Sequence, residues 1–202
     1  MSNDSATGGY VVPEGAGPVE DDVLTDVITD FVSGITGLAR QLVRPRWQPQ
    51  APNQPDRDVD WCAAGVTEQR PYDHPYVAHD AAGDNGEGVD RMQRHEELEV
   101  LVSFYGPNSS RNAKRLRDGL YIGQNRDAMT RDAGLKLIGC GAVAAIPELV
   151  NSLWLNRADL RIELRRQIDR VYPIRNVKSA QVELEAEGAE LHKTDIIITE
   201  RE

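Results

Sequence analysis

The stretch from residue 96 to residue 121 most narrowly limits what this chain can fold into. Its even-numbered apolar residues alternate with more polar odd-numbered ones, and they are Leu98, Val100, Val102 and Phe104. A period of two is typical of a strand with one buried face and one wetter face. We therefore expect the even-numbered side chains to face the core. The odd-numbered side chains expected to face solvent or a neighbour include Glu97, Glu99 and Ser103.

The residues that follow predict a turn and then a helix. Gly106 and Pro107 break the strand, because glycine tolerates dihedral angles that other residues resist and proline cannot donate to a ladder. Asn108 or Ser109 can cap the helix that comes next. One face of that helix is marked by apolar residues at helical spacing, Ala113, Leu116 and Leu120. This strand, turn and helix carry no nucleophile, no paired base and no metal ligands, so we interpret them as scaffold.

Other segments show similar strand and helix patterns. A helix is expected from Asp21 or Asp22, and a second short one over residues 125–133. Strands are expected over residues 41–48, 61–68, 74–79, 135–140, 180–187 and 194–199, the first of them at a sheet edge because it contains a proline. Residues 147–156 are ambiguous. Residues 158–172 fit both periods, and we favour a strand because the residues before Pro173 are β-branched or aromatic.

Together these elements predict an α+β fold with a single, mostly antiparallel sheet and two to three flanking helices. We assign this domain to residues 21–178. Residues 1–20 are rich in glycine, proline and serine, so we expect an extended arm that is ordered only on a neighbour, or else a floppy tail. Residues 179–202 are expected to form an acidic C-terminal strand pair or tail.

The charge balance and the cysteine content exclude several classes of protein. A net charge of −10 argues against general affinity for nucleic acid, and it suits a surface that DNA passes without sticking. Two cysteines, Cys62 and Cys140, are too few for a disulfide scaffold or a cysteine-based zinc site. We expect no membrane span and no signal peptide, and therefore synthesis in a reducing cytoplasm.

One glycine-rich segment offers a possible nucleotide site. The residues from Gly139 to Ala144 match the G-x-G-x-x-[GA] fingerprint of dinucleotide-binding turns. That turn needs a helix beginning near its second glycine, but Pro147 would fall inside the helix and no βαβ pattern surrounds it. A cytoplasmic α+β enzyme that binds a nucleotide at this turn is our alternative hypothesis. Apart from it, we predict no catalytic, cofactor-binding or metal-binding residues.

The C-terminal third of the chain is segregated by charge. Residues 157–178 hold seven basic and three acidic residues, and residues 183–202 hold seven acidic and two basic ones. Two solvated faces would explain this pattern. The more specific hypothesis is that the basic strand of one copy meets an acidic surface of a neighbour, where charges set register and association rate. The candidate interface residues are Arg157, Arg161, Arg165, Arg166, Arg170 and Arg175.

Several blocks of the sequence resemble the tail or neck terminator proteins of tailed bacteriophages. They are residues 29–53, 56–71, 94–108, 117–129 and 147–181. Their most specific pieces are the Phe104–Asn108 turn after the alternating strand and the Arg157–Leu160 run that opens a late strand. The acidic last twenty residues lie outside these blocks.

The resemblance implies a structural virion protein without catalytic residues. It implies an α/β subunit that forms a ring, usually of six copies. Such a ring caps the tail tube, ends its polymerisation and joins the tail to the head-completion ring. The implied partners are further copies of the chain, the tail tube protein, the head-completion or stopper protein and, in a tail that has one, the sheath. DNA passes through the channel without specific binding, and assembly takes place in the host cytoplasm before the protein resides in the virion. A monomeric adaptor is a third hypothesis.

Overall fold

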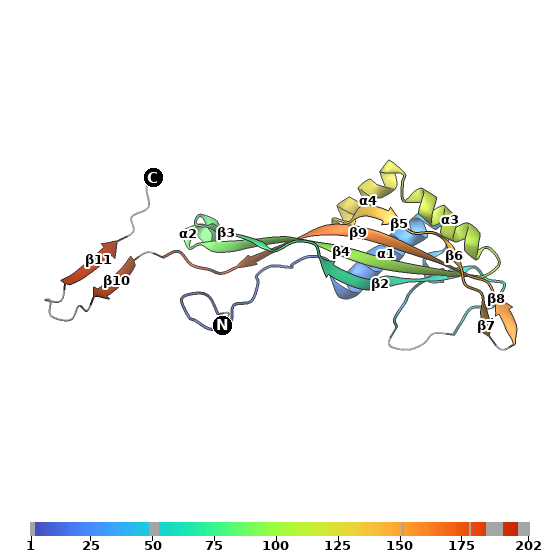
Figure 1. The fold of residues 1–202 in the computed structure, drawn as a ribbon, viewed down its shortest axis with the longest axis horizontal. Helices are drawn as coiled ribbons and strands as arrows, with labels where there is room; N and C mark the ends of the chain where they lie inside the picture. The colour runs from blue at the N-terminus through green and yellow to red at the C-terminus, as the bar shows by residue number, and fades with distance from the viewer. Residues whose placement is uncertain (1–2, 49–52, 151, 178, 185–191, 198–202) are drawn as a thin grey trace. The chain divides into compact units, whose positions relative to one another are not determined.

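A computed structural model describes residues 3–48, 53–150, 152–177, 179–184 and 192–197, and it has an α+β architecture (Figure 1). The helices are α1 (Asp21–Thr36), the short 3-10 helix η1 (Arg40–Leu42), α2 (Gly83–Gly86), α3 (Ser109–Gly119) and α4 (Gly123–Ala133). The strands are β1 (Val43–Pro45), β2 (Trp61–Pro71), β3 (Tyr76–Asp80), β4 (Val89–Tyr105), β5 (Lys136–Cys140), β6 (Ala144–Ala145), β7 (Glu148–Val150), β8 (Leu153–Leu155), β9 (Arg157–Tyr172), β10 (Ser179–Leu184) and β11 (His192–Ile197).

Seven of these strands form one mixed sheet. Its main order is β1-β2-β4-β9-β5, with β3 paired to β4 and β6 paired to β9. The β1–β2 pair is parallel, whereas β2–β4, β5–β9 and β6–β9 are antiparallel. The predicted α+β class with a mostly antiparallel sheet is confirmed, and so is the edge position of the strand that contains Pro45. The segment that fitted both periods is the strand β9.

Two short strand pairs stand outside the main sheet. Within the ambiguous residues 147–156, the strands β7 and β8 pair in an antiparallel manner, and we refer to this pair as the β7–β8 hairpin. The predicted C-terminal strand pair is confirmed as β10 and β11, which are antiparallel to each other. The rest of the acidic C-terminal segment lies outside the described residues.

The chain divides into two compact units. The larger unit contains residues 17–76 and 93–169, and the smaller one contains the residues up to 16, residues 77–92 and those from 170 onward. The long strands β4 and β9 therefore contribute to both. The division into an arm, a domain over 21–178 and a C-terminal segment stays a prediction.

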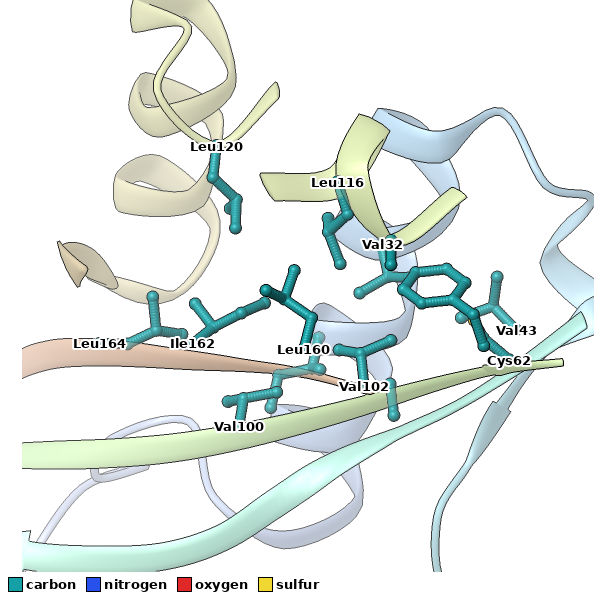
Figure 2. Packing of buried hydrophobic residues seen from close by; sticks show 14 of the residues in the cluster. Val32, Val43, Cys62, Val100, Val102, Leu116, Leu120, Leu160, Ile162 and Leu164 are labelled. Carbon is teal, nitrogen blue, oxygen red and sulfur yellow. The ribbon is translucent and has the colours of Figure 1, made fainter. Parts of the chain in front are cut away.

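The core of the larger unit lies between the sheet and its helices. The even-numbered side chains of β4, from Leu98 to Phe104, are at most 1% exposed, as predicted. Figure 2 shows Val100, Val102 and Leu160 pointing from the strands toward Leu116 of α3. The same cluster includes Leu24, Ile28 and Val32 of α1, Ala113 of α3 and Leu120 directly after α3. Helical and strand periodicities thus converge on one layer of apolar side chains.

The turn after β4 differs from the expected helix cap. No side chain caps α3, and Asn108 instead binds Asp60 at the start of β2. The backbone N–H and the side-chain amide of Asn108 each donate to that carboxylate at 2.8 Å. Gly106 has φ +102°, and a Cβ there would lie 2.5 Å from the carbonyl oxygen of Val59. The turn after β4 therefore packs closely against the residues that precede β2. Only glycine fits at position 106, because of the positive φ and the short distance to Val59.

Ser103 was expected to face solvent or a neighbour, and this prediction is wrong in one respect. Its side chain does lie on the face opposite the core, but the residue is fully buried. The hydroxyl of Ser103 accepts hydrogen bonds from Arg46 at 2.9 Å and from Arg157 at 3.4 Å. Two long arginine side chains cover the serine, because their stems can bury while their guanidinium groups remain bound to polar partners. Glu97 and Glu99 are partly exposed.

The register of β4 leads to a first testable prediction. Replacing Phe104 by Ala should lower the free energy of unfolding by about 3–5 kcal/mol, because it leaves a cavity among fully buried side chains. Glu99→Ala, which removes only an exposed ion pair and hydrogen bond on the other face, should cost less than about 1 kcal/mol. Urea unfolding followed by circular dichroism measures both. Equal losses for the two variants would mean that the register is wrong by one residue.

In the smaller unit, the N-terminal arm contacts its own chain. The N–H of Glu14 donates to the carbonyl of Val171 at 2.7 Å, and the N–H of Ser5 donates to that of Pro173 at 3.2 Å. Arg175 forms ion pairs with Asp4 and with Asp84. The arm was expected to be ordered only on a neighbour. Backbone hydrogen bonds to the end of β9 hold its described part within one chain.

His79 is held between two acceptors in the smaller unit. Its Nδ1 lies 2.7 Å from Oδ1 of Asp90, and its Nε2 lies 2.7 Å from Oδ1 of Asn176. The amide nitrogen of Asn176 donates to the carbonyls of Ala81 and Gly86, which orients its oxygen toward the histidine. Both ring nitrogens can donate only in the imidazolium form. The hydrogen bonds to Asn176 and Asp90 accordingly raise the pKa of His79 above its ordinary value.

This arrangement predicts a pH dependence. A raised pKa in the folded state means that the contribution of His79 to stability is present below its ordinary pKa of about 6.5, and that it is lost as the pH rises through the folded value. Amide hydrogen exchange around residues 80–88 should therefore speed up over that range beyond the intrinsic increase. His79→Gln, which cannot titrate, serves as the control. A His79 resonance that titrates at or below the ordinary value would contradict the prediction.

Candidate interaction surface on the outer sheet face

The sheet of the larger unit has an outer face, which we define as the side opposite the apolar core. It carries the odd-numbered side chains of β4 from Glu97 to Tyr105 and those of β9 from Arg157 to Arg165. Successive side chains of a strand point to opposite faces, so these positions are set by the same alternation that builds the core. In contrast to the core face, most of these residues are charged or polar.

Opposite charges face each other across β4 and β9. Nη2 of Arg165 lies 2.7 Å from Oε1 of Glu97, and Nη1 of Arg161 lies 3.3 Å from Oε1 of Glu99. Glu99 also accepts a hydrogen bond from the hydroxyl of Thr67 on β2 at 2.9 Å. Ion pairs this accessible contribute little to stability, so their pattern matters more for the choice and orientation of a partner.

Arg157 connects the beginning of β9 to the β7–β8 hairpin. Its Nε and Nη2 bind the two oxygens of Asp159, each at 2.7 Å, and its Nη1 pairs with Glu148 of β7. The guanidinium carbon lies 5.8 Å from the ring centroid of Tyr105. Hydrogen bonds to Asp159 and Glu148 raise the pKa of Arg157, which is charged at any physiological pH. This residue holds the hairpin in place and is mostly buried.

Aromatic rings and arginines line a cavity beside the edge strand β1. The rings of Trp61 and Tyr105 stack with centroids 4.3 Å apart and an angle of 12° between their planes. Arg44 lies 5.6 Å from the Trp61 ring and Arg46 lies 5.9 Å from the Trp47 ring. The cavity has a volume of about 550 Å³. Its guanidinium groups and aromatic faces are chemically suited to an acidic or aromatic side chain of another protein.

The six arginines predicted as interface residues do not share one surface. Arg157, Arg161 and Arg165 lie on the outer face. Arg166 points to the opposite face, where it is 3% exposed and bound to Glu96. Arg165 and Arg166 are consecutive, and the side chains of consecutive strand residues point to opposite faces of a sheet. Of the remaining two, which belong to the smaller unit, Arg170 is half-buried and Arg175 is bound to Asp4 and Asp84. Whether any of the six meets a neighbour stays a prediction.

Sequence reasoning missed the aromatic and basic residues around the cavity. They come from three separate segments, the last of which, at Tyr105, lies more than forty positions after Trp61, and residue spacing gives no sign that they meet. Trp61 and Tyr105 are direct cross-strand partners in the β2–β4 register. One signal was present in the sequence: Tyr105 is the last odd-numbered residue of the alternating strand β4, and the alternation places it on the outer face.

The glycine-rich segment from Gly139 to Ala144 lacks the geometry of a nucleotide site. It connects β5 to β6, and both strands pair with β9. The N–H of Gly141 donates to the carbonyl of Arg161 at 2.9 Å. A dinucleotide-binding turn leads into a helix whose N-terminus receives the phosphates, whereas this one leads into a strand.

Other reactive groups in the described part of the chain do not assemble into a site. No cluster of three or more histidine, cysteine, aspartate or glutamate side chains suited to a metal ion occurs among the described residues. Burial raises the pKa of Cys62 to about 12 and that of Cys140 to about 11, which suppresses the reactive thiolate. Among those residues, no helix is long and apolar enough to cross a membrane.

The third prediction tests the nucleotide hypothesis directly. Nicotinamide and adenine nucleotides should leave the melting temperature unchanged, because the turn at Gly139 offers no helix N-terminus. A ligand at 100 times its dissociation constant would stabilise the fold by about 2.7 kcal/mol, which differential scanning fluorimetry detects easily. A stabilisation that disappears in Gly141→Val would contradict the prediction.

A comparison with known families identifies one match. A family model described as "Phage neck terminator protein" matches residues 22–188, which span the region from α1 to the C-terminal strand pair. No curated protein matches the chain.

Proposed function

Because the chain belongs to the phage neck terminator family, a family of structural phage proteins, we propose that it forms a ring that caps the tail tube. The ring, of six copies, ends polymerisation of the tube and joins the tail to the head-completion ring. The observation that carries this proposal is the family match, which includes both long strands and the hairpin between β6 and β9. The chain then acts through surfaces and not through catalysis.

A closed ring of identical subunits needs two different surfaces on each subunit, because one copy contacts the next head to tail. The outer face supports one such surface. Arg161 has a 65% exposed side chain, and Arg165 follows four positions later on the same face, with Glu163 between them. An acidic surface of a neighbour, such as the segment over residues 183–202 with its seven acids, is the complementary partner. We retain Arg161 and Arg165 as the interface residues, because their side chains are exposed to 65% and 36%, whereas those of Arg157 and Arg166 are mostly buried in ion pairs within the chain.

The net charge of −10 supports a role beside DNA without binding to it. A channel lined mainly by acidic or neutral groups repels phosphates, so DNA slides through it. In this proposal the tail tube protein and the head-completion or stopper protein contact opposite sides of the ring, and a sheath is a further partner where the tail has one. The ring assembles in the host cytoplasm and stays in the neck of the virion.

Charge reversal on the outer face tests the proposal. The double variant Arg161→Glu, Arg165→Glu should remain folded by circular dichroism, because both residues are at least partly exposed. It should stop tails from joining heads or allow tubes to grow beyond normal length, as seen by negative-stain electron microscopy. Reversal of Arg166 is unsuitable, because it would place two carboxylates together in a buried site.

A matched control reverses two exposed charges elsewhere. Lys114→Glu, Arg126→Glu makes the same change in net charge on α3 and α4, and it should give normal particles. Infectious particles with tails of normal length from the outer-face variant would contradict the interface assignment. A wild-type protein that co-purifies with no phage structural component, or that acts as a monomer, would contradict the terminator function.

A further inference from the structure

We propose that the β7–β8 hairpin of one copy docks into a groove between α1 and α4 of a second copy. The inference rests on the proposed function, because it supplies a specific head-to-tail contact for the ring. It concerns surfaces other than the charged outer face. The two strands of the hairpin and the lining of the groove are described residues of the larger unit.

The hairpin presents an uncovered apolar pair. Leu149 and Trp154 are direct partners in the β7–β8 register, so their side chains share one face. Leu149 is 61% exposed and Trp154 is 68% exposed, whereas Leu155 on the other face is buried. Arg157 anchors the hairpin through Glu148, and its carbonyl accepts the N–H of Ile146 at 2.9 Å. A two-stranded hairpin with an exposed apolar face is characteristic of a protein interaction site.

The hairpin also lacks charge of its own. Glu148 is the only charged residue between positions 145 and 156, and it is paired with Arg157. Docking therefore requires no desolvation of an unpaired charge. Tryptophan is enriched among the residues that contribute most to binding when they enter a pocket of a protein interface.

The groove between α1 and α4 has the complementary character. Val27 and Phe31 of α1 and Ala128 and Met129 of α4 line it, and its volume is about 400 Å³. Gly34 leaves it open, because a Cβ at that position would meet no atom within 4 Å. A glycine inside a helix is unfavourable compared with alanine, so local helix stability does not explain this residue.

The rim of the groove provides what a buried indole needs. Asp30, Asp132 and Asn125 contribute oxygen acceptors at its edge. Trp154 is 68% exposed, and an indole N–H finds an acceptor when it is buried. Asp30 and Asp132 are paired with Arg40 and Arg131 of the same chain, so the rim is polar without a large excess of negative charge. Such a rim accepts an uncharged apolar face with a single N–H donor. Polarity and charge therefore favour this hairpin as the occupant.

The positions of the two features favour a second copy over an intramolecular contact. The hairpin lies beside the end of β4, where the N–H of Gly106 donates to the carbonyl of Asn156. Helix α3 leads away from this point to α4, and Figure 1 shows α4 toward the other end of the larger unit. A protrusion at one end and a groove at the other form a heterologous contact, which closes into a ring or continues as a filament.

Two substitutions separate the two sides of the contact. Trp154→Ala removes the anchor, and Gly34→Leu fills the groove with a residue that favours helix. Each alone should weaken self-association of the purified full-length protein by about 30-fold or more, as measured by light scattering and native mass spectrometry. Mixed in equal amounts, the two variants should form one-to-one pairs and no larger assemblies, because only one productive contact remains. A second groove variant, Ala128→Leu, should behave like Gly34→Leu.

Matched controls show that the effects are local. Gly34→Ala adds a single methyl group to the groove, and Tyr76→Ala removes a side chain as exposed as that of Trp154. Both should self-associate as the wild type does, and circular dichroism should show that every variant is folded. A photo-crosslinking amino acid at position 154, used in the purified protein and in assembled tails, should label residues of α1 or α4 in another copy.

The outcomes distinguish this inference from the proposed function. If rings form and cap tubes but neither substitution weakens them, or if position 154 crosslinks elsewhere in the chain or not at all, the hairpin contact is overturned and the terminator function stands. Crosslinks from position 154 to the tail tube or head-completion protein overturn it as well, by identifying another occupant. If the wild type neither forms rings nor associates with tails, the terminator function itself fails.

Discussion

The fold depends on two long alternating strands, β4 and β9, lying side by side in one sheet. Their even-numbered residues from Leu98 to Phe104 and from Ala158 to Leu164 are apolar and pack with α1 and α3 in the core. Their odd-numbered residues are mostly charged and pair across the strands, as Arg161 does with Glu99. Burial of the apolar side drives folding, and the same register leaves the charged side on the outer face. The scaffold and the proposed interaction surface are therefore two faces of one pattern.

At the edge of the core this pattern changes from apolar to ionic. Glu96 and Arg166 hold the next even-numbered positions on the buried faces of β4 and β9, where the apolar core cluster stops. Nε of Arg166 donates to Glu96 at 2.6 Å. The guanidinium also donates to the carbonyl of Val19, just before α1. The attraction within a buried ion pair barely offsets the cost of removing both charges from water, so the pair adds little net stability. Its role is to position the chain where it enters the first helix. Arg166 therefore serves the fold and not a surface contact.

The surfaces that could act in a phage neck all depend on this scaffold. The rows of charge on the outer face and the aromatic cavity at Trp61 and Tyr105 follow from the strand registers. The β7–β8 hairpin is held to β9 by Arg157, and the groove is bounded by the helix that covers the core and its neighbour α4. This member of the neck terminator family thus has several distinct surfaces on one sheet and its helices. In the proposed ring these surfaces serve as contacts, because each copy of a ring meets two neighbours.

The sequence by itself determined the α+β class, the buried face of β4 and the strand character of residues 158–172. The period of the apolar residues indicates which face is buried, and β-branched residues favour an extended backbone. It also indicated the family through local runs of residues. Only the tertiary structure decided that arginines bury Ser103, that Asn108 binds Asp60 instead of capping a helix, and that Arg165 and Arg166 have separate roles. Those contacts join positions up to seventy residues apart, and strand register and turn geometry, not local spacing, bring them together.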